Sequence, residues 1–313
     1  MDVFVTGGGG FLGQELVSKL LENGCSVTYP RSRDCNLFDP DALEKFAHTK
    51  FDRIFHLAAW TQAGDFCLLH PGEQWINNQK INTNVLTWWQ AHQPQAKLIF
   101  MGTSCAYPID MELRERNYMS GEPIDSLYTY AMTKRMLFQG ARSIEKQFGQ
   151  TWLCAVPSTL YGPRYHLDGR QMHFIFDLVR KILRGKLLGD RVVLWGDGHQ
   201  RRELVHVRSF VDILLNLTEN VDNKLLNIGA GEDYSIRDFV KIICEEINFD
   251  ETHIEYDTTR YVGAKAKMLE ISEIENEILD YKSSLIPLRE GLKETIDWFI
   301  AEKAYLGVDE RSI

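Results

Sequence analysis

The sequence predicts an α/β fold in which a doubly wound parallel sheet is joined to a smaller, mixed α/β lobe. Short, nearly continuous apolar runs alternate with amphipathic helical patterns through the first half of the chain, as a parallel sheet buried on both faces requires. Four glycines stand between the first apolar run and the first helical pattern. The length of 313 residues exceeds the roughly 250 to 300 residues at which single cores stop growing, so two lobes are expected.

The first half of the chain alternates predicted strands and helices. Apolar runs predict strands over residues 1–8, 26–30, 53–59, 97–103 and 151–158. Apolar residues at helical spacing predict helices over residues 11–24, 39–49, 81–93 and 130–147. In the first helix, Leu12, Leu16 and Leu20 share one face and Gly24 marks the end.

A glycine-rich turn joins the first predicted strand to the first predicted helix. Gly7, Gly10 and Gly13 form the pattern GxxGxxG. Such a turn lets the backbone approach a pyrophosphate while the helix amino terminus faces its negative charge, which predicts a Rossmann-type dinucleotide site. The structural alternative is a tight corner without a ligand. The expected cofactor contacts here and at the end of the third strand are Gly7, Gly10, Phe11, Leu12, Gly13, Ala58 and Ala59.

The second predicted strand ends in TYPRSRD, which bears on the choice of cofactor. A dinucleotide with a free adenosine ribose usually meets an Asp or Glu at this position. Here Arg31 and Arg33 come first, and Asp34 follows them. Because two guanidinium groups suit a 2′-phosphate, the sequence favours NADP(H) over NAD(H). The alternative is a solvated loop with ordinary surface arginines.

The alternation weakens after residue 165, where the second lobe is expected. Helices are predicted over residues 174–183 and 288–303, with short strands between them. Residues 203–207, the helix after them and residues 224–230 are expected to return to the sheet. We therefore expect an NADP-binding Rossmann domain over residues 1–165, joined by segments from about 200–230, and a mainly substrate-binding lobe over residues 166–313.

Charge and cysteine usage argue against several classes of partner. The formal net charge of -9 and the pI near 5.5 would repel nucleic acid and anionic membranes. No stretch approaches the roughly 18 apolar residues that span a bilayer, and the start lacks a basic signal region, so we expect a cytoplasmic protein. The six cysteines lack CxxC spacing, so neither a metal site nor a disulfide framework is expected.

Tyr130 and Lys134 form the pattern YxxxK in a predicted helix. Residues four apart lie on one helix face, so the ammonium group can favour the ionised phenol. Such a tyrosine can exchange a proton with a carbonyl oxygen while a nicotinamide exchanges hydride with the carbon. The pattern also arises by chance in amphipathic helices. Here it follows a strand that ends in a hydroxyl residue, Thr103, within a predicted dinucleotide-binding domain.

These residues together resemble the extended short-chain dehydrogenases/reductases, the NAD-dependent epimerase/dehydratase family. The resemblance covers nearly the whole chain and rests on GTSCAYP, YAMTK, LYGPRY, WGDGHQRRELVHV and the tail GLKETIDWF, in the family's order. The closer match within the family is to enzymes that epimerise C3 and C5 of a GDP-4-keto-6-deoxy sugar and then reduce C4. The stretch RSRDCNLFD also resembles the NADP-binding segment of those enzymes.

The resemblance implies roles for the residues around the fourth predicted strand and the YxxxK helix. It assigns the family's hydroxyl role to Thr103 and makes Ser104 a substrate contact. Tyr130 becomes the proton donor, and Lys134 the residue that tunes it. In the related sugar-nucleotide dehydratases an Asp and Glu pair follows the threonine, whereas this chain has Ser104 and Cys105. Dehydration is therefore disfavoured.

Cys105 and His173 are the base and acid that the resemblance implies for epimerisation. A thiolate can remove a proton from a carbon next to a 4-keto group. His173 would then return a proton from the opposite face, so that C3 and C5 invert before C4 is reduced. The structural alternatives are a small core cysteine at a strand end and a histidine that only packs.

Three further residues are implied as contacts of a GDP-linked sugar: Thr159, Arg202 and Lys267. Arg202 matches an arginine near the diphosphate, and Lys267 matches a lysine near the end of the substrate lobe. The family typically has Asn where this chain has Thr159. Its usual HVxD pattern reads HVRS here, so Arg208 and Ser209 stand at the last two positions and the acid is missing. These departures bear on the identity of the sugar. The loop before His173 adds three residues that the family pattern does not dictate: His166, Asp168 and Arg170.

The first hypothesis, which the resemblance implies, is an NADPH-dependent 3,5-epimerase/4-reductase of a GDP-4-keto-6-deoxy sugar, hexose or heptose. A second hypothesis is a GDP-sugar 3,5-epimerase that keeps its nicotinamide, or a 4-reductase acting alone. A third is a non-catalytic dinucleotide-binding sensor, which would not require the Thr, Tyr and Lys set. The helices over residues 81–93 and 130–147 can pair across a two-fold axis, as the resemblance implies for a homodimer, or within one chain.

Overall fold

The centre of the fold is a six-stranded parallel sheet, in the order β10-β5-β4-β3-β1-β2. The computed structural model describes residues 1–64, 66–259 and 265–307. From β1 the chain moves outward to β2 and then returns to form β3 on the other side of β1. Ligands of such sheets bind at this reversal, outside the carboxyl ends of the strands. The strands are β1 (Asp2–Thr6), β2 (Ser26–Thr28), β3 (Arg53–His56), β4 (Lys97–Met101), β5 (Trp152–Pro157) and β10 (Lys224–Ile228).

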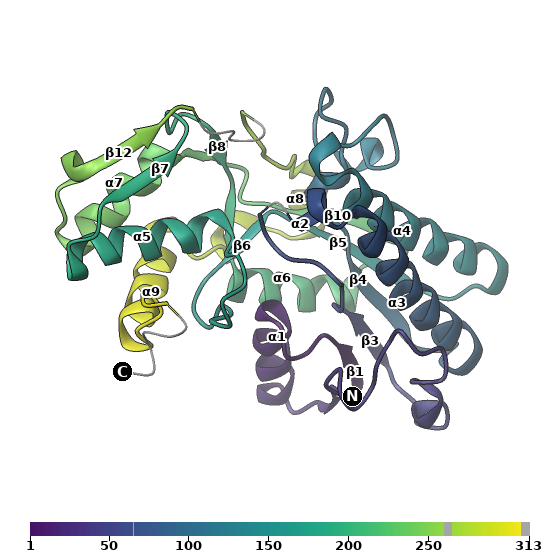
Figure 1. The fold of residues 1–313 in the computed structure, drawn as a ribbon. Coiled ribbons are helices and arrows are strands. Elements are labelled where there is room, and N and C mark those ends of the chain that lie inside the picture. Colours follow the sequence, from purple (N-terminus) through teal and green to yellow (C-terminus); the bar gives the residue numbers. More distant parts are fainter. Residues whose placement is uncertain (65, 260–264, 308–313) are drawn as a thin grey trace.

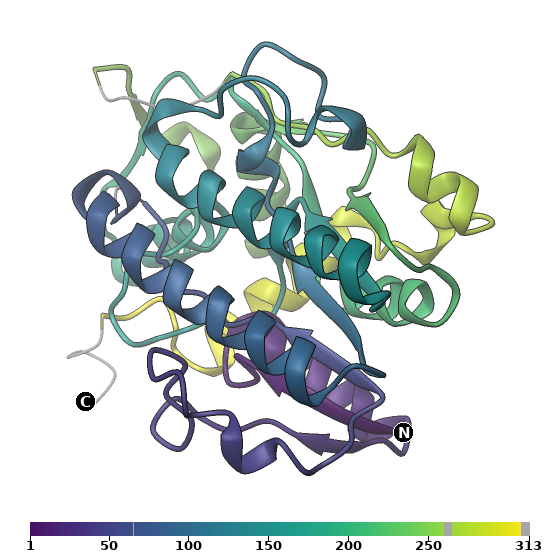
Figure 2. The same ribbon diagram turned by 90° about the vertical axis from the view of Figure 1, so that its right-hand side faces the viewer.

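Helices cover both faces of the sheet, which is the predicted doubly wound arrangement. Helices α1 (Phe11–Glu22) and α6 (Val207–Asn220) pack together on one face. Helices α3 (Pro71–His92) and α4 (Tyr128–Phe148) pack together on the other, and Figure 2 shows them side by side in front of the sheet. Two short helices, α2 (Phe66–Leu69) and α8 (Ser272–Glu277), lie beside α3 and β10 respectively.

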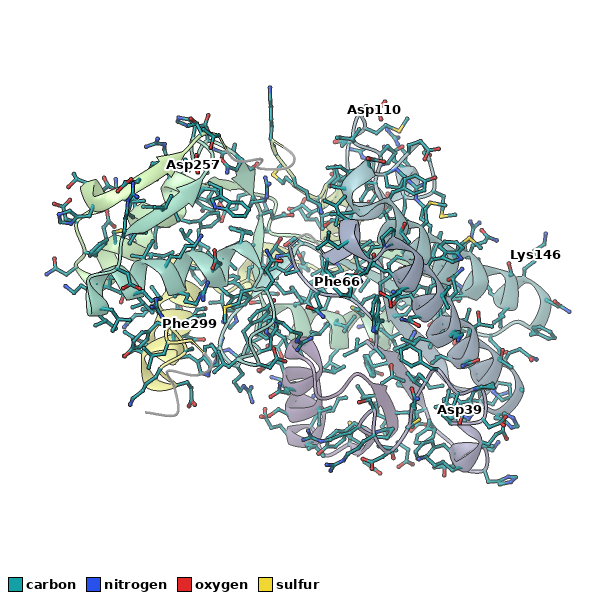
Figure 3. All side chains as sticks on the ribbon, in the orientation of Figure 1. Asp39, Phe66, Asp110, Lys146, Asp257 and Phe299 are labelled. Atoms are coloured by element: carbon teal, nitrogen blue, oxygen red, sulfur yellow. The ribbon has the colours of Figure 1, made fainter. Side chains whose placement is uncertain are left out.

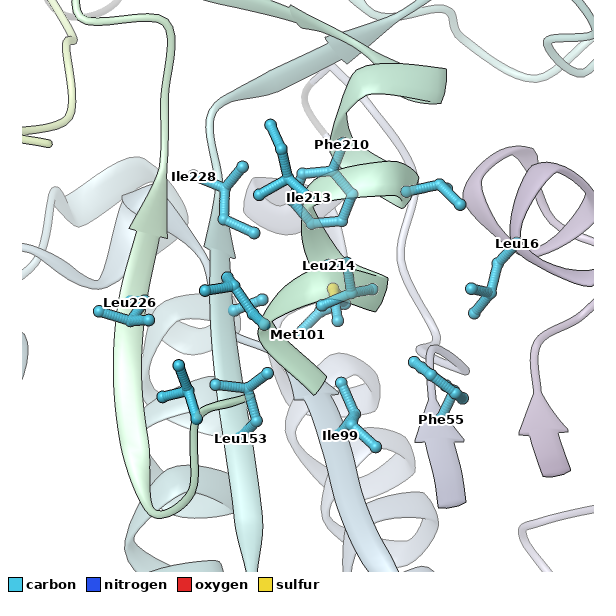
Figure 4. Packing of buried hydrophobic residues seen from close by; sticks show 14 of the residues in the cluster. Leu16, Phe55, Ile99, Met101, Leu153, Phe210, Ile213, Leu214, Leu226 and Ile228 are labelled. Atoms are coloured by element: carbon cyan, nitrogen blue, oxygen red, sulfur yellow. The ribbon is translucent and has the colours of Figure 1, made fainter. Parts of the chain in front are cut away.

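Each face of the sheet has its own apolar core. On the α1 and α6 face, Leu16, Leu153 of β5 and Leu214 belong to one apolar cluster, and all three are fully buried (Figure 4). On the opposite face, Trp88 and Trp89 of α3 are buried in a second apolar cluster, where Trp88 packs against Phe4 of β1 and Phe51. Burying a side chain of this kind stabilises the fold by about 1.5–3 kcal/mol. The strands are apolar at successive positions because both of their faces are covered.

A second lobe lies beside the sheet domain (Figure 1). Its core is formed by apolar stripes of α5 (Phe174–Leu188), α7 (Ile236–Ile247) and α9 (Leu288–Ala301) around the parallel pair β7 (Val192–Trp195) and β12 (Ile254–Asp257). Figure 3 shows Phe299 of α9 within this lobe and Phe66 of α2 near its boundary with the sheet domain. Among the described residues, no helix is both long and apolar enough to cross a membrane.

Two minor sheets connect the lobes. The parallel pair is β6 (Thr159–Tyr161) with β9 (Leu204–His206), and the antiparallel pair is β8 (Arg201–Arg202) with β11 (Tyr234–Ser235). The expected return of residues 203–207 to the main sheet is therefore wrong for the strand itself. Strand β10 occupies the position beside β5, and β9 pairs with β6 instead.

The predicted helix over residues 39–49 is also absent from the structure. This segment forms turns with one short 3-10 turn, Glu44–Phe46. Asp39 accepts the Asp41 N–H at 3.0 Å through its side chain, a local bond that competes with the helix. Gln93 of the α3 end donates to the Phe46 and Thr49 carbonyls, so the loop is held by a partner distant in sequence.

Lys97, at the start of β4, binds the backbone carbonyl groups at the carboxyl end of α6. Its ammonium group donates to the Thr218 carbonyl at 2.6 Å and to the Val221 carbonyl, and pairs with Asp222 at 2.8 Å. A cation here satisfies the last helix carbonyls and the negative end of the helix dipole.

We expect Lys97→Met to lower the free energy of unfolding by about 2 kcal/mol, because charge-assisted hydrogen bonds are lost. Urea titration followed by tryptophan fluorescence measures this, and Lys146→Met on the exposed end of α4 is the control. Equal losses in both variants would contradict the prediction.

Candidate active site

The glycine-rich turn forms an open cradle before α1. Gly7 has a φ of +71°, and a Cβ there would lie 2.8 Å from the Ala58 backbone nitrogen. A Cβ at Gly13 would lie 2.1 Å from the Gly7 carbonyl oxygen, so the close packing requires glycine at both positions. Helix α1 begins after Gly10 with no side-chain cap and no acidic residue in its first turn. Its first N–H groups and its dipole therefore suit a pyrophosphate.

The other residues expected at the cofactor surround this cradle. Ala58 donates its backbone N–H to Thr6 Oγ1 at 3.2 Å, which ties the end of β3 to the end of β1, and Ala59 follows. The Phe11 ring packs edge-on against two aromatic rings of the second lobe. Leu12 packs against the core of the sheet. The side chains of these last two residues are therefore used in packing.

Arg31 and Arg33 lie in the exposed turn after β2. The Arg33 side chain is 80% exposed and pairs with Asp34 at 3.6 Å. Tyr29, just after β2, reaches the cradle, since a Cβ at Gly8 would lie 2.9 Å from the Tyr29 Cβ. A dinucleotide in the cradle would direct its adenosine ribose toward this turn. The two guanidinium groups therefore fit a 2′-phosphate.

Tyr130 and Lys134 lie one turn apart on α4. The Lys134 ammonium group lies 5.9 Å from the centre of the Tyr130 ring. Burial lowers the pKa of Lys134 to about 8. Burial raises the pKa of Tyr130, and the neighbouring thiols of Cys105 and Cys67 add to this effect. A protonated phenol beside an ammonium group can give up its proton and leave a stabilised phenolate.

A buried network anchors this part of α4 to the sheet. His56, at the end of β3, contacts Thr6 Oγ1 through Nδ1 at 2.8 Å and Asn82 Oδ1 through Nε2 at 3.1 Å. Asn82 donates to the carbonyl of Thr133, one residue before Lys134. Burial, together with the Lys134 charge, lowers the pKa of His56 to about 4. The ring is therefore neutral at pH 7 and adds no second positive charge beside Lys134.

Thr103 stands after the carboxyl end of β4 and contacts Tyr130. Its hydroxyl group lies beside the Tyr130 phenol, where it opposes the effect of burial on the phenol pKa. The same oxygen accepts the Cys105 N–H at 3.2 Å and thereby caps the short turn Ser104–Ala106. The Thr103 backbone N–H donates to the Tyr118 hydroxyl at 3.3 Å. One bond to the hydroxyl oxygen and one from the backbone N–H thus hold Thr103 beside the phenol.

The Cys105 thiol touches a lysine from a distant part of the chain. Lys267 Nζ lies 2.9 Å from Cys105 Sγ. Burial by itself would raise the pKa of the thiol, but the Lys267 charge and hydrogen bonds from Lys267 and Thr103 outweigh it and hold the pKa below its ordinary value. Since Cys105 in turn raises the pKa of Tyr130, the two groups belong to one site. The thiol is therefore placed and polarised as a base.

His173 stands immediately before α5, and its backbone N–H donates to the Tyr165 hydroxyl at 3.3 Å. His173 is an exposed residue in the free protein. Desolvation by its neighbours, the Lys267 charge and His166 lower the pKa of its ring. Lys267 therefore acts on His173 as well as on Cys105. The acid role expected for His173 needs the protonated ring, which the Lys267 charge disfavours in the free protein.

The four residues expected at the substrate all line one small pocket. Arg202 and Lys267 supply two cationic groups, which suit a diphosphate. Ser104 and Thr159 supply hydroxyl groups from the segments after β4 and β5. The complete lining is Ser104, Ser158, Thr159, Arg202, Glu203, Lys267 and Leu269.

The charged residues that the family pattern did not explain have local partners. Arg208 pairs with Glu294 and so joins the start of α6 to α9. Asp168 pairs with both His166, at 3.3 Å, and Arg170, at 2.8 Å, within one loop. None of these charged side chains lines the pocket above.

Arg135, on α4, is a buried residue of the site that the sequence interpretation missed. It is 5% exposed, and its guanidinium group donates to the carbonyls of Ala106 and Gly121. It therefore ties the turn that carries Cys105 to the helix that carries the tyrosine. Its place on the same helix face as Ala131 and Phe138, which are buried, was the available sequence signal.

Glu203 is the second residue that was missed. It is 2% exposed, and its carboxylate accepts the N–H groups of Ala230, Gly231 and Leu269 at 2.7, 2.9 and 3.0 Å. Burial raises its pKa to about 7, although these three bonds oppose the shift. The carboxylate joins the loop after β10 to the segment that carries Lys267. An acidic residue at the edge of an apolar run, beside Arg202, was the available signal.

Comparisons with known proteins place this geometry in context. The model of the NAD dependent epimerase/dehydratase family matches residues 3–229. The chain is 26% identical to the GDP-L-colitose synthase of Yersinia pseudotuberculosis, over 97% of this chain and 99% of that protein. It is also 26% identical to the GDP-L-fucose synthase of Escherichia coli (strain K12), over 95% and 96%. A GDP-D-glycero-L-gluco-heptose synthase from Campylobacter jejuni, solved in the presence of NADPH, superposes with a TM-score of 0.84 at 21% identity, covering 96% and 98%.

Proposed function

Since this chain belongs to the NAD dependent epimerase/dehydratase family, we propose that it epimerises and reduces a GDP-linked 4-keto sugar with NADPH. The family match over residues 3–229 confirms the resemblance that the sequence motifs indicated. The proposed reaction is 3,5-epimerisation of a GDP-4-keto-6-deoxy sugar, a hexose or heptose, followed by reduction of C4. The observation that carries it is the Cys105 thiol, which contacts Lys267 beside Thr103 and Tyr130.

The proton for the reduction comes from Tyr130. When bound in the cradle before α1, NADPH would supply the hydride to C4. The Thr103 hydroxyl and the Tyr130 phenol hold the carbonyl oxygen, which takes the phenol proton as its negative charge develops. The Lys134 ammonium group stabilises the phenolate that remains.

The epimerisation uses the 4-keto group before that group is reduced. The ketone makes the hydrogens on C3 and C5 acidic. The Cys105 thiolate takes one such proton, so that the C–H bond breaks, its electron pair enters the enolate and an S–H bond forms. Return of a proton to the opposite face inverts the carbon, and His173 is the proposed donor. This second step requires a protonated ring at His173.

Reduction should slow as the pH rises through about 8. Burial lowers the pKa of Lys134 to about 8, so its ammonium group is present below that pH and lost above it. The phenolate then loses its stabilising charge. Initial rates of NADPH absorbance loss across about pH 6 to 10 measure this limb. Ionisation of Cys105 would instead increase the rate as the pH rises, because more of the thiolate base would be present. A rate that stays constant to about pH 9.5 would contradict the role of Lys134.

Replacing both Arg31 and Arg33 by alanine should raise the KM for NADPH by about tenfold to a hundredfold, because charge-assisted hydrogen bonds to the 2′-phosphate are lost. The KM for NADH should change by less than about twofold, since that cofactor lacks the phosphate. Steady-state kinetics with both cofactors measures the difference, and Arg116→Ala, at an exposed position, is the control. An equal loss for both cofactors would contradict the assignment of NADP(H).

One incubation separates the candidate reactions. The protein is mixed with NADPH and GDP-4-keto-6-deoxymannose in deuterated water. Loss of NADPH with deuterium at C3 and C5 supports the proposal. Deuterium without net loss of NADPH indicates a 3,5-epimerase, and NADPH loss without deuterium indicates a 4-reductase. Binding of NADPH without either change indicates a dinucleotide sensor.

We also propose a homodimer in which α3 and α4 pair with the same helices of a second copy. The two helices pack on each other within the chain, yet Ile76 and Met136 remain 53% and 42% exposed on them. Two such pairs would make a four-helix bundle that covers these side chains. Sedimentation at low protein concentration tests this, and a monomer alone would overturn it.

A further inference from the structure

We propose that Lys267 keeps Cys105 ionised in the free protein by holding its ammonium group against the sulfur. The resemblance implied only a nucleotide-binding role for Lys267, so its contact with the thiol is a separate function. The use of the thiolate in epimerisation rests on the proposed function. The pairing itself is a property of the chain without substrate.

The contact is direct and joins two segments that are far apart in the sequence. Lys267 Nζ lies 2.9 Å from Cys105 Sγ, across 162 residues of sequence. The thiol belongs to the turn after β4, whereas Lys267 belongs to the segment that returns from β12 toward α8. An opposite charge at this distance strongly favours the thiolate over the thiol.

The backbone on both sides of Lys267 is fixed. The Lys265 carbonyl accepts the Arg201 N–H at 2.8 Å. The Leu269 N–H donates to the buried Glu203 carboxylate at 3.0 Å. Because the segment is held two residues before and two residues after Lys267, the side chain loses less freedom on pairing than a lysine on a loose loop. Glu203 is therefore a positioning residue for the cation.

The other groups that face the thiol do not supply a positive charge. The Thr103 hydroxyl group, which accepts the Cys105 backbone N–H, lowers the pKa of the thiol but is uncharged. Tyr130 of α4 and Cys67 of α2 have acidic protons, and burial raises the pKa of both, so they are neutral at pH 7. Among the described residues, Lys267 is the cation that acts on Cys105.

The test is the pH dependence of Cys105 alkylation by iodoacetamide, with neither NADPH nor sugar present. Peptide mass spectrometry follows each cysteine separately. Cys25 is the other half-exposed thiol and serves as the internal reference. Alkylation of the buried Cys154 or Cys244 would reveal unfolding. We expect Lys267→Met to raise the midpoint for Cys105 by about one to three pH units and to slow its alkylation at pH 7 by about tenfold or more.

Two matched variants complete the experiment. Lys267→Arg keeps the charge and should restore most of the reactivity, whereas Lys265→Met, at an exposed position two residues away, should leave the midpoint unchanged. An unchanged midpoint in Lys267→Met, with Cys154 and Cys244 still protected, would overturn the proposal. Since no substrate is present, that result would not depend on whether the chain epimerises a GDP-linked sugar. A failed turnover assay would likewise leave the alkylation result standing.

Discussion

Replacing Tyr130 by phenylalanine should lower kcat for keto-sugar reduction by about 10²- to 10⁴-fold. In the proposed reaction the phenol touches the developing alkoxide and gives it a proton. The Thr103 hydroxyl group lies beside the phenol, burial keeps the phenol protonated, and Lys134 lies 5.9 Å from its ring. Phenylalanine keeps the ring but removes the proton, so the loss should appear in kcat. Stopped-flow or steady-state loss of NADPH absorbance measures it.

Tyr128→Phe is the matched control for this substitution. Tyr128 lies two residues earlier on α4 and is 39% exposed, so it loses a hydroxyl group at the protein surface. Its kcat should stay within about twofold of the wild-type value. Binding of NADPH, followed by fluorescence, should be similar in both variants. If Tyr130→Phe retained more than about a tenth of the wild-type kcat, the proton would have to come from another group.

Replacing Cys105 by alanine should abolish deuterium incorporation at C3 and C5, with a fall in rate of about 10²- to 10⁴-fold. The thiolate is the base in the proposed epimerisation, and its contact with Lys267 at 2.9 Å favours the ionised form. Alanine cannot accept a proton. Mass spectrometry and proton NMR of the sugar recovered from deuterated water measure the exchange directly, separately from NADPH consumption.

Two further variants decide how this result is interpreted. Cys105→Ser keeps a similar shape but replaces the thiolate by a hydroxyl group that stays protonated at pH 7, so it should also lose the exchange. Ser104→Ala, in the same turn, removes a pocket hydroxyl group but not the base. It should retain exchange within about tenfold. If Cys105→Ser still incorporated deuterium at both carbons at the wild-type rate, Cys105 would not be the base.

The parts of the fold that were predicted correctly are those with a strong local pattern. Strands β1, β4 and β5 are nearly continuous apolar runs, and α1, α4 and α9 carry clear apolar stripes. The loop over residues 39–49 has a helical pattern of similar strength but is fixed by Gln93 instead. A contact from a distant residue overrode the local preference there.

The candidate site divides in the same way. Gly7, Gly13, Tyr130 and Lys134 belong to short motifs whose spacing reflects one turn or one helix, and such spacing is visible along the chain. Arg135 was not among the predicted site residues, although it is adjacent to Lys134. Its role depends on the Ala106 and Gly121 carbonyls, which reach it only because the loop after β4 folds back over α4.

The order of apolar and polar residues was thus enough to establish the class of fold, the cradle before α1 and the pairing of a phenol with an ammonium group on α4. The partner of the Cys105 thiol depended on the folded chain. Parallel strands bring their carboxyl ends to one edge of the sheet, where Lys267 reaches the thiol from 162 residues along the chain. Local spacing cannot predict such a contact, because it forms only when the chain has folded and Glu203 holds the segment of Lys267 in place.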